Sequence, residues 1–317
     1  MTRQQRPGFD RVDIQILLGT ICVVSFLLVG VHPARALEVV NCDWIKPSSQ
    51  TQRPPGTWSL STLPVGHGDA HLIEAPGGQV SLVDTASTET VDTVVQYLKR
   101  REIDNIDRII LTHPHWDHIG GVPTLVRQFD VGAVYRPGLD HPTHLNRRTD
   151  DVLRKYAVPV HIRQRGETIP LSPTSTATVL HPGPQRTGSL NPDSLAFSFS
   201  AGPVRIAMMG DVIGKSVETL RSHNRLTSVD VVKIAHHGNE SGTPGVLLDE
   251  LDPRVAIITA PLRTNDPWGK PDPELIQRLR NHGITIFHTG KTGTIRLTMN
   301  KEGLNSVAIG SLEACGK

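Results

Sequence analysis

Three histidines and one aspartate lie within six consecutive residues of this 317-residue chain: His113, His115, Asp117 and His118. Imidazole nitrogens and carboxylate oxygens are ligands that Zn²⁺ takes in catalytic sites, where one coordination position stays open for water. Side chains alternate along an extended segment, so the first two histidines can point the same way. The aspartate and the last histidine follow on a turn and can face a second position. The spacing therefore predicts a site for two metal ions.

The neighbouring segments place this motif on a loop between a strand and a helix. Residues 107–111 form an apolar run of strand length before it, and Gly120-Gly121 leads into the helix-like residues 122–129. A His-rich loop of this kind can also be polar surface or an adventitious metal-binding patch.

The rest of the chain alternates between predicted strands and predicted helices. In residues 88–101 the apolar side chains recur at helical spacing, and residues 194–200 and 204–209 form a predicted hairpin around a Gly-Pro turn. The other predicted strands are residues 58–63, 70–74, 80–84, 176–180, 229–234, 255–258, 284–287 and 293–299, and the other predicted helices are residues 144–158, 215–225 and 273–281.

The His-x-His-x-Asp-His motif is the signature of the metallo-β-lactamase superfamily, which the chain resembles over residues 58–299. Four further segments resemble the hydrolase domain of ComEC competence proteins. Residues 63–70 (Leu-Pro-Val-Gly-His-Gly-Asp-Ala) are similar to that group's Val-Gly-Gln-Gly-Asp-Ala turn, and residues 81–84 to its second strand. Residues 208–211 and 233–238 are similar to its Gly-Asp and His-His-Gly blocks. Several motifs in the right order are far more specific than one.

The resemblance implies an α/β protein with the four-layer αββα metallo-β-lactamase fold. In such a fold, strands that run toward the metal edge should end in ligands. Residues 109–111 end near His113, residues 207–209 end before Asp211, and residues 231–234 end before the adjacent pair His236 and His237. We therefore expect these strand ends to meet.

The same resemblance assigns the metal ligands. His113 and His115 would hold the first metal, and Asp117, His118 and His237 the second. Asp211 would bridge the two, since a carboxylate can hold two cations about 3.5–4 Å apart. Alternatively, Asp211 caps the helix that follows. His236 would be a hydrogen-bonding neighbour of the site or a buried structural residue.

The first metal lacks the third histidine found in zinc β-lactamases. The corresponding loop, residues 180–194, offers His181 at a strand end, and Asn191 and Asp193 nearer the expected offset. We expect His181 as a possible ligand. A first metal held by His113, His115 and Asp211 alone would exchange more readily, and this departure argues against a true β-lactamase.

The implied cofactors are two zinc ions or other divalent transition metals. A water bound to zinc has a pKa of about 7, so such a centre supplies hydroxide at neutral pH. Asp117 or Asp84 would orient that hydroxide and later protonate the leaving group. His288 lies where ComEC-like domains carry a turn near the site and could hydrogen-bond the substrate, although it could also be a surface residue. Lys291 is a possible phosphate contact or a solvated lysine.

The N-terminus has the features of a secretory leader. Three arginines precede an apolar run over residues 14–31, and Ala34-Arg35-Ala36 offers a signal-peptidase site. An uncleaved membrane anchor is the alternative. The expected organisation is a signal peptide over residues 1–36, a polar lead-in over residues 37–56 and a hydrolase domain over residues 57–317.

Cysteine usage agrees with export to an oxidising compartment, where disulfides form. Only Cys42 and Cys315 remain outside the expected leader, one near each end of the chain. The ends of a compact domain often lie close together, so we predict a Cys42–Cys315 disulfide; two free thiols are the alternative.

The charge of the expected mature chain limits its partners. Residues 1–36 carry four of the 33 basic and two of the 31 acidic residues, which leaves the remainder neutral. Strong sequence-independent nucleic-acid binders carry a basic excess, so we expect no strong nucleic-acid binding. We also expect no stable membrane partner after cleavage, and the oligomeric state stays open.

Together these features predict an exported dinuclear-metal hydrolase, periplasmic or secreted. A phosphodiester or phosphate-ester substrate is favoured, because the ComEC resemblance implies a nuclease activity. A lactone or carboxylic-ester hydrolase is the first alternative, and a non-catalytic zinc-binding protein with a decayed site is the second.

Overall fold

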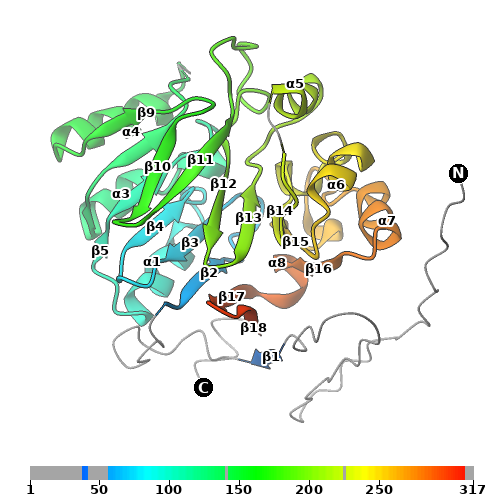
Figure 1. Cartoon of the computed structure of the whole chain (residues 1–317). Helices are drawn as coiled ribbons and strands as arrows, with labels where there is room; N and C mark the ends of the chain where they lie inside the picture. Colours follow the sequence, from blue (N-terminus) through cyan, green and yellow to red (C-terminus); the bar gives the residue numbers. More distant parts are fainter. Residues whose placement is uncertain (1–37, 42–55, 140–141, 224–225, 311–317) are drawn as a thin grey trace, which may run out of the picture.

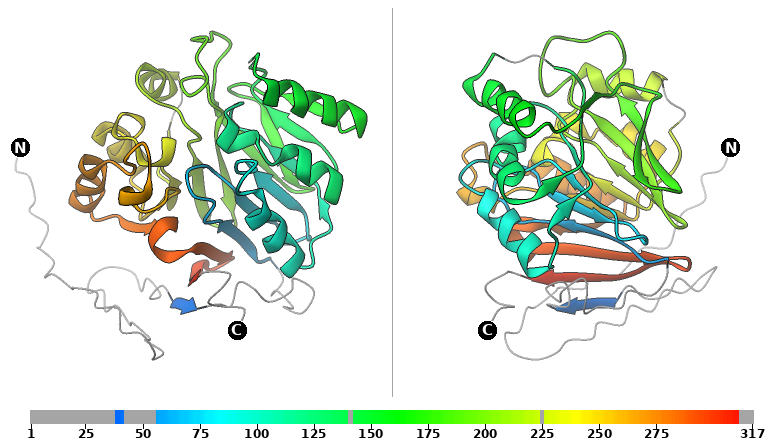
Figure 2. Two further views of the ribbon diagram at one scale, coloured as in Figure 1. Left: turned by 180° about the vertical axis from the view of Figure 1, so that it is seen from behind. Right: turned by 90° about the vertical axis from the view of Figure 1, so that its left-hand side faces the viewer.

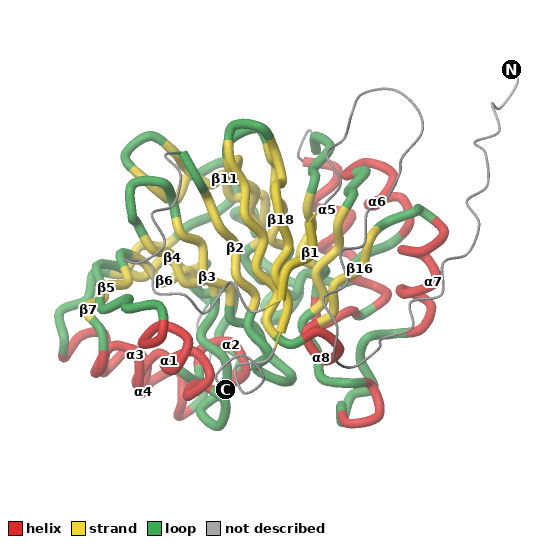
Figure 3. The backbone as a smooth tube through the Cα atoms, turned by 90° about the horizontal axis from the view of Figure 1, so that it is seen from below, coloured by secondary structure: helices red, strands yellow, loops and turns green. Residues whose placement is uncertain are grey.

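The computed structural model describes residues 38–41, 56–139, 142–223 and 226–310. Two β-sheets pack face to face, and helices cover the outer face of each (Figures 1 and 2). This is the four-layer αββα architecture that the sequence predicts. Viewed from below, the helices lie on the two outer sides of the paired sheets (Figure 3).

The first sheet contains the N-terminal and C-terminal strands. In spatial order it consists of β1 (Glu38–Asn41), β18 (Gly303–Gly310), β17 (Thr294–Asn300), β2 (Trp58–Thr62), β3 (His71–Glu74), β4 (Val80–Val83), β6 (Arg108–Ile110), β8 (Val134–Arg136) and β9 (Val160–Ile162). Its outer face is covered by α1 (Val91–Arg100), α3 (Val122–Gln128) and α4 (His144–Lys155). A small separate sheet pairs β5 (Asn105–Ile106) with β7 (Asp130–Val131).

The second sheet is formed by the middle of the chain. Its order is β10 (Thr168–Ser172), β11 (Ser175–His181), β12 (Ala196–Ala201), β13 (Val204–Met208), β14 (Val231–Lys233), β15 (Val255–Ile258) and β16 (Thr285–His288). Its outer face is covered by α5 (Lys215–His223), α6 (Gly245–Leu251) and α7 (Pro273–Asn281). The short helices are α2 (Trp116–Ile119), α8 (Thr289–Thr292) and the 3₁₀ turns η2 (His236–Gly238), η3 (Glu240–Gly242) and η4 (Arg263–Asn265).

Three apolar layers hold the four structural layers together. Side chains alternate along a strand, so Leu82 of β4 faces the helices while Val83 faces the second sheet. In β14, Val231 likewise joins the layer between the sheets and Val232 the layer under α5 to α7. Because both faces are buried, apolar residues stand next to each other in these strands, as Leu82-Val83 and Val231-Val232 do, and do not alternate strictly with polar ones.

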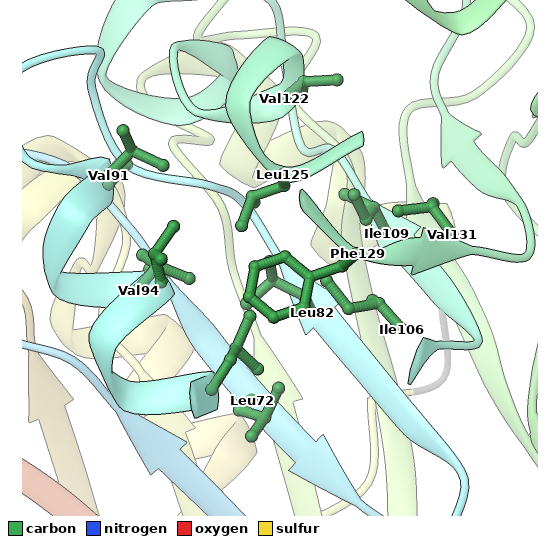
Figure 4. Packing of buried hydrophobic residues seen from close by; sticks show 14 of the residues in the cluster. Leu72, Leu82, Val91, Val94, Ile106, Ile109, Val122, Leu125, Phe129 and Val131 are labelled. Atoms are coloured by element: carbon green, nitrogen blue, oxygen red, sulfur yellow. The ribbon is translucent and has the colours of Figure 1, made fainter. Parts of the chain in front are cut away.

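Helix α1 shows how the outer layer attaches. Val91 and Val94 point at the sheet and pack with Leu72 and Leu82 of β3 and β4 (Figure 4). Lys99 and Arg100 occupy its last turn, where positive charge complements the helix dipole. The spacing of its apolar residues, which predicted the helix, is the spacing that buries one face.

Parallel pairing brings the ligand-bearing strand ends to one edge. β4 pairs in parallel with β6, and β13 pairs in parallel with β14. Parallel strands end at the same edge of a sheet. Within the second sheet this places the segments after β13 and β14 together. The segment after β6 of the first sheet meets them, with His113 Nε2 3.7 Å from Asp211 Oδ2, as predicted.

Parts of the expected chain organisation fall outside the described residues. Residues 1–36, expected as a leader, and Cys42 and Cys315, expected as a disulfide, lie there. Within the expected lead-in, β1 pairs in parallel with β18 and so extends the first sheet. Across the described ranges, no helix combines the length and apolar character needed to span a bilayer.

Candidate metal centre

Asp211 stands at the centre of a buried cluster of histidines. Its Oδ2 lies 3.3 Å from Nε2 of His118, 3.6 Å from Nε2 of His237 and 3.7 Å from Nε2 of His113. The backbone N–H of Asp211 donates to Ser194 Oγ at 3.0 Å, which fixes the start of its turn. One carboxylate thus faces histidines from both of the motifs that the sequence singles out.

Asp117 completes one set of donors. Its Oδ2 lies 3.3 Å from His237 Nε2 and 3.5 Å from His118 Nε2. Ligands at about 2.0–2.1 Å around a tetrahedral zinc are separated by about 3.3–3.4 Å. The four distances that join Asp117 and Asp211 to His118 and His237 are thus close to the spacing of ligands around one ion, the second metal of the sequence prediction.

The predicted first metal position has fewer donors close to one another than the second. His113 and His115 lie together, with His113 Nε2 at 2.8 Å from His115 Nδ1. His113, His118 and Asp211 also form a group of donor atoms within 4.8 Å of one another. The ligands predicted for the first metal are thus adjacent to those of the second and share Asp211 with them.

Unsatisfied buried atoms show that this donor set fits a metal. Nε2 of His118, Nε2 of His237 and Oδ1 of Asp211 are buried, and within the described ranges they have no hydrogen-bond partner of acceptable geometry. Leaving such atoms unpaired is costly, and native proteins rarely do so. Imidazole nitrogen and carboxylate oxygen suit a divalent transition metal such as zinc.

The charges of the cluster support one another. Burial alone would lower the pKa of His118, but the Asp211, Asp117 and Asp84 carboxylates outweigh it and raise that pKa well above its usual value. Burial would raise the pKa of Asp211, yet His118 and His237 hold it well below the ordinary range. The lowered pKa of Asp211 favours its ionised form, which can bind a cation.

Asp84 lies behind His118 and contacts its Nδ1, and its expected role at the reacting atoms stays a prediction. Its Oδ2 lies 2.8 Å from His118 Nδ1, and its two oxygens accept from the backbone and hydroxyl of Thr112 at 2.8 and 2.7 Å. Asp84 is fully buried, and both of its oxygens are engaged by Thr112 and His118. It therefore orients the His118 ring so that Nε2 faces Asp211. A carboxylate that orients a ligating histidine is a common feature of metal sites.

His237 is oriented by the backbone. His236 and His237 both adopt left-handed φ values, 47° and 55°, in the turn after β14, a conformation that non-glycine residues rarely hold. His237 Nδ1 lies 3.0 Å from the carbonyl oxygen of Thr259, so its Nε2 points at Asp117 and Asp211. Such strain is typical of functional sites.

The loop that should supply a third ligand to the first metal is arranged differently. His181 Nε2 lies 2.8 Å from the carbonyl oxygen of Pro192, and burial lowers the pKa of His181 to about 4. Asp193 accepts the backbone N–H groups of Thr187 and Gly188 and so closes the loop. The structure does not bring either residue into the donor groups found in the described part of the chain.

Asn191 and His236 approach the cluster from its side. The Asn191 side-chain amide lies 3.0 Å from His236 Nε2, and that nitrogen lies 4.0 Å from Asp211 Oδ2. This geometry favours His236 as a hydrogen-bonding neighbour of the first metal position.

Comparison with known proteins decides the family. The family profile of the metallo-beta-lactamase superfamily matches residues 63–258, which include all the clustered ligands. The chain belongs to the metallo-β-lactamase superfamily. This confirms the family and the fold predicted from the sequence, and it places the chain among metal-dependent hydrolases.

The relatives include competence proteins. ComE operon protein 3 of Bacillus subtilis is 25% identical over 302 residues, which cover 90% of this chain and 36% of that protein. Recombination protein 2 of Haemophilus influenzae is 25% identical over 279 residues, covering 84% of this chain and 32% of that protein. The chain thus spans about a third of the length of these ComEC-family relatives. Hydroxyacylglutathione hydrolase of Vibrio cholerae is 39% identical over 77 residues, 22% of this chain and 29% of that protein.

Other residues of this superfamily member stand apart from the clustered donors. His288 is buried at the end of β16, paired with Ile258 of β15, and burial lowers its pKa with a further contribution from Lys291. His288 is not part of the donor groups formed by the described residues, and its contact with substrate stays a prediction. Lys291 lies on α8 and is exposed.

Sequence reasoning missed His67 and Asp69. His67 belongs to a donor group with Asp117 and His237. Asp69 is buried, forms an ion pair with Lys233, accepts the Thr259 hydroxyl and has Oδ1 3.7 Å from His237 Nδ1. Both belong to the Gly-His-Gly-Asp segment that carried the ComEC resemblance, which was the available signal.

Proposed function

We propose that this protein is a hydrolase with a dinuclear metal centre that acts on phosphodiesters or phosphate esters. The observation that carries the proposal is the position of Asp211, whose Oδ2 lies within 3.7 Å of Nε2 of His113, His118 and His237. Zinc or another divalent transition metal bound there would lower the pKa of a coordinated water to about 7 and neutralise negative charge that develops on the substrate.

The chain's own residues would position the water and the substrate. Burial would raise the pKa of Asp117, but His118 and His237 outweigh it and lower that pKa, so Asp117 is a carboxylate at neutral pH. As a carboxylate it can orient an attacking water and accept a proton from it. His118 and His237 are held in place from behind by Asp84 and the Thr259 carbonyl.

Two observations support a phosphodiester that carries planar groups. The ComEC-family relatives match most of this chain. In addition, Trp116 and Trp268 are 45% and 53% exposed beside the ligands, with ring centroids 6.1 Å apart. Exposed aromatic rings next to a phosphate-cleaving centre suit the stacking of nucleobases.

A carboxylic-ester, thioester or lactone hydrolase is the second candidate. The partial match to hydroxyacylglutathione hydrolase favours it. The same donor set would stabilise the negative charge that develops on a cleaved ester. A zinc-binding protein without activity is the third possibility, against which the intact pair Asp117 and Asp211 counts.

We also propose that the protein is exported, because of the leader-like residues 1–36. The neutral charge balance beyond this leader supports a small or weakly held substrate over a tightly bound nucleic acid.

A hydrolysis screen tests the proposed function. Protein purified without chelator would be assayed on bis-p-nitrophenyl phosphate, p-nitrophenyl phosphate, a lactone panel and a hydroxyacyl thioester. We expect metal-dependent turnover of the phosphodiester, lost in Asp211→Asn and kept in the surface control Asp249→Asn. Turnover of esters alone would favour the second candidate, and metal binding without any turnover would favour the third.

A further inference from the structure

His67 lies beside the second metal position, in the loop between β2 and β3. Its Nε2 is 3.8 Å from Asp117 Oδ2, and the donor atoms of His67, Asp117 and His237 all lie within 4.8 Å of one another. Any metal-binding role of His67 rests on the proposed dinuclear centre.

The backbone of this loop is pressed against the metal-binding loop. The N–H of Asp69 donates to the carbonyl oxygen of Asp117 at 3.3 Å. Gly68 has a φ of +142°, and a Cβ at this position would lie 2.5 Å from that same carbonyl oxygen. Glycine at position 68 thus permits the close approach that sets the distance between His67 and the other ligands.

The His67 side chain is held by a loop from the far end of the sequence. Its Nδ1 lies 2.8 Å from Oδ1 of Asp266, and Asp266 Oδ2 in turn accepts the backbone N–H of Lys270 at 2.6 Å. The ring packs against those of Trp268 and His237, with centroids 4.1 and 4.2 Å away. Rotation is therefore restricted, and Nε2 faces the cluster.

This arrangement is that of a metal ligand. When Nδ1–H donates to Asp266, Nε2 carries the lone pair, and a ligating histidine usually donates its other N–H to a carboxylate in this way. The 3.8 Å separation from Asp117 Oδ2 is too long for a hydrogen bond. Two electron-rich atoms facing each other at this distance are stabilised by a cation between them.

We propose that His67 is a ligand of the second metal, in addition to Asp117, His118, Asp211 and His237. The second position then has more protein donors than the first. The donors of the first position are His113, His115 and the bridging Asp211. The two positions should differ in affinity, so the second fills first and releases its ion last.

A titration of the chelator-stripped full chain with Co²⁺, followed by visible absorption, tests the proposal. Wild-type protein should bind in a tight step and a weaker step. His67→Gln should weaken the tight step by about tenfold or more and change its absorption band, while the weaker step is unaltered. Asp266→Asn leaves the ligand but removes its orienting carboxylate, so it should shift the same step in the same direction by less.

His282→Gln is the matched control, because it breaks an exposed histidine–aspartate pair with Asp249 at 3.3 Å. It should titrate like wild type. If His67→Gln and Asp266→Asn both keep the wild-type tight step and spectrum, His67 is not a ligand. Slower hydrolysis with an unchanged titration would overturn the proposal in favour of a proton-donating role. Wild-type protein that binds no Co²⁺ would instead overturn the dinuclear function itself.

Discussion

Asp211 is the residue on which the two proposed metal positions depend. Its Oδ2 contacts histidines from the segment after β6 and from the turn after β14. These histidines come from different sheets, so the carboxylate also joins the two layers at the metal edge.

Asp211→Asn removes the charge that holds both ions while keeping the side chain's shape. Activity on the best substrate should fall by at least about 100-fold, and bound metal should fall below two ions per chain. The fold should survive, because the apolar layers are untouched. Metal analysis, turnover and circular dichroism check this, and wild-type turnover would mean that Asp211 acts only as a helix cap.

The substitution Asp84→Asn distinguishes a role in orienting the His118 ring from a direct role in the reaction. Because Asp84 contacts His118 from behind, we expect a loss of about 10–100-fold in metal affinity. Turnover should recover when excess metal restores occupancy. If turnover stays low at full occupancy, Asp84 acts on the reacting atoms, as the sequence first indicated.

Local spacing could reveal ligands only where the partners lie close in the sequence. His113, His115, Asp117 and His118 fall within one loop and were predicted together. His67 depends on Asp266, which lies 199 residues away. Residues 63–70 contain no signal that Asp266 and Trp268, from a later loop, will contact the His67 ring.

At the scale of elements, a buried ionic network holds α1 on the first sheet. Glu74, at the end of β3, accepts from Arg101 after α1 and from Arg296 on β17. All three side chains are buried. Since β3 is antiparallel to β4, Glu74 lies at the edge opposite the metal centre.

Glu74→Gln would remove the carboxylate charge that faces two buried guanidinium groups. The free energy of unfolding should fall by about 3–5 kcal/mol, measured by urea denaturation, with metal content unchanged. The matched control is Glu250→Gln, which breaks the partly exposed pair with Arg221 and should lower the free energy of unfolding far less, because solvent screens exposed charges. Equal effects of the two substitutions would contradict the role assigned to burial.

Elements were predictable where burial on both faces or one apolar stripe left a clear pattern. The helix over residues 273–281 and the hairpin of β12 and β13 were found in this way. β8 and β9 were not predicted, because each spans three residues, too few to show an alternation of apolar and polar side chains. β18 was missed because its residues 303–306 are only half-buried and include polar side chains.

At the scale of the whole molecule, the two ends of the described chain lie side by side. β1 pairs in parallel with β18, with Asn41 opposite Ile309. Cleavage after Ala36 would leave all of β1 in the mature chain, so export and this pairing are compatible. Cys42 follows β1 directly, and Cys315 follows β18 by five residues.

Because β1 and β18 run in the same direction, the chain leaves both strands at the same edge of the sheet, which favours the predicted Cys42–Cys315 disulfide. Such a bridge closes a loop of nearly the whole mature chain and would contribute about 4–5 kcal/mol in the chain-entropy model, less any strain. Reduction should therefore lower the melting temperature without releasing metal, because neither sulfur belongs to the ligand set. Thiol titration of denatured, unreduced protein from an oxidising compartment should find no free thiol in the mature chain; two per chain would exclude the bridge.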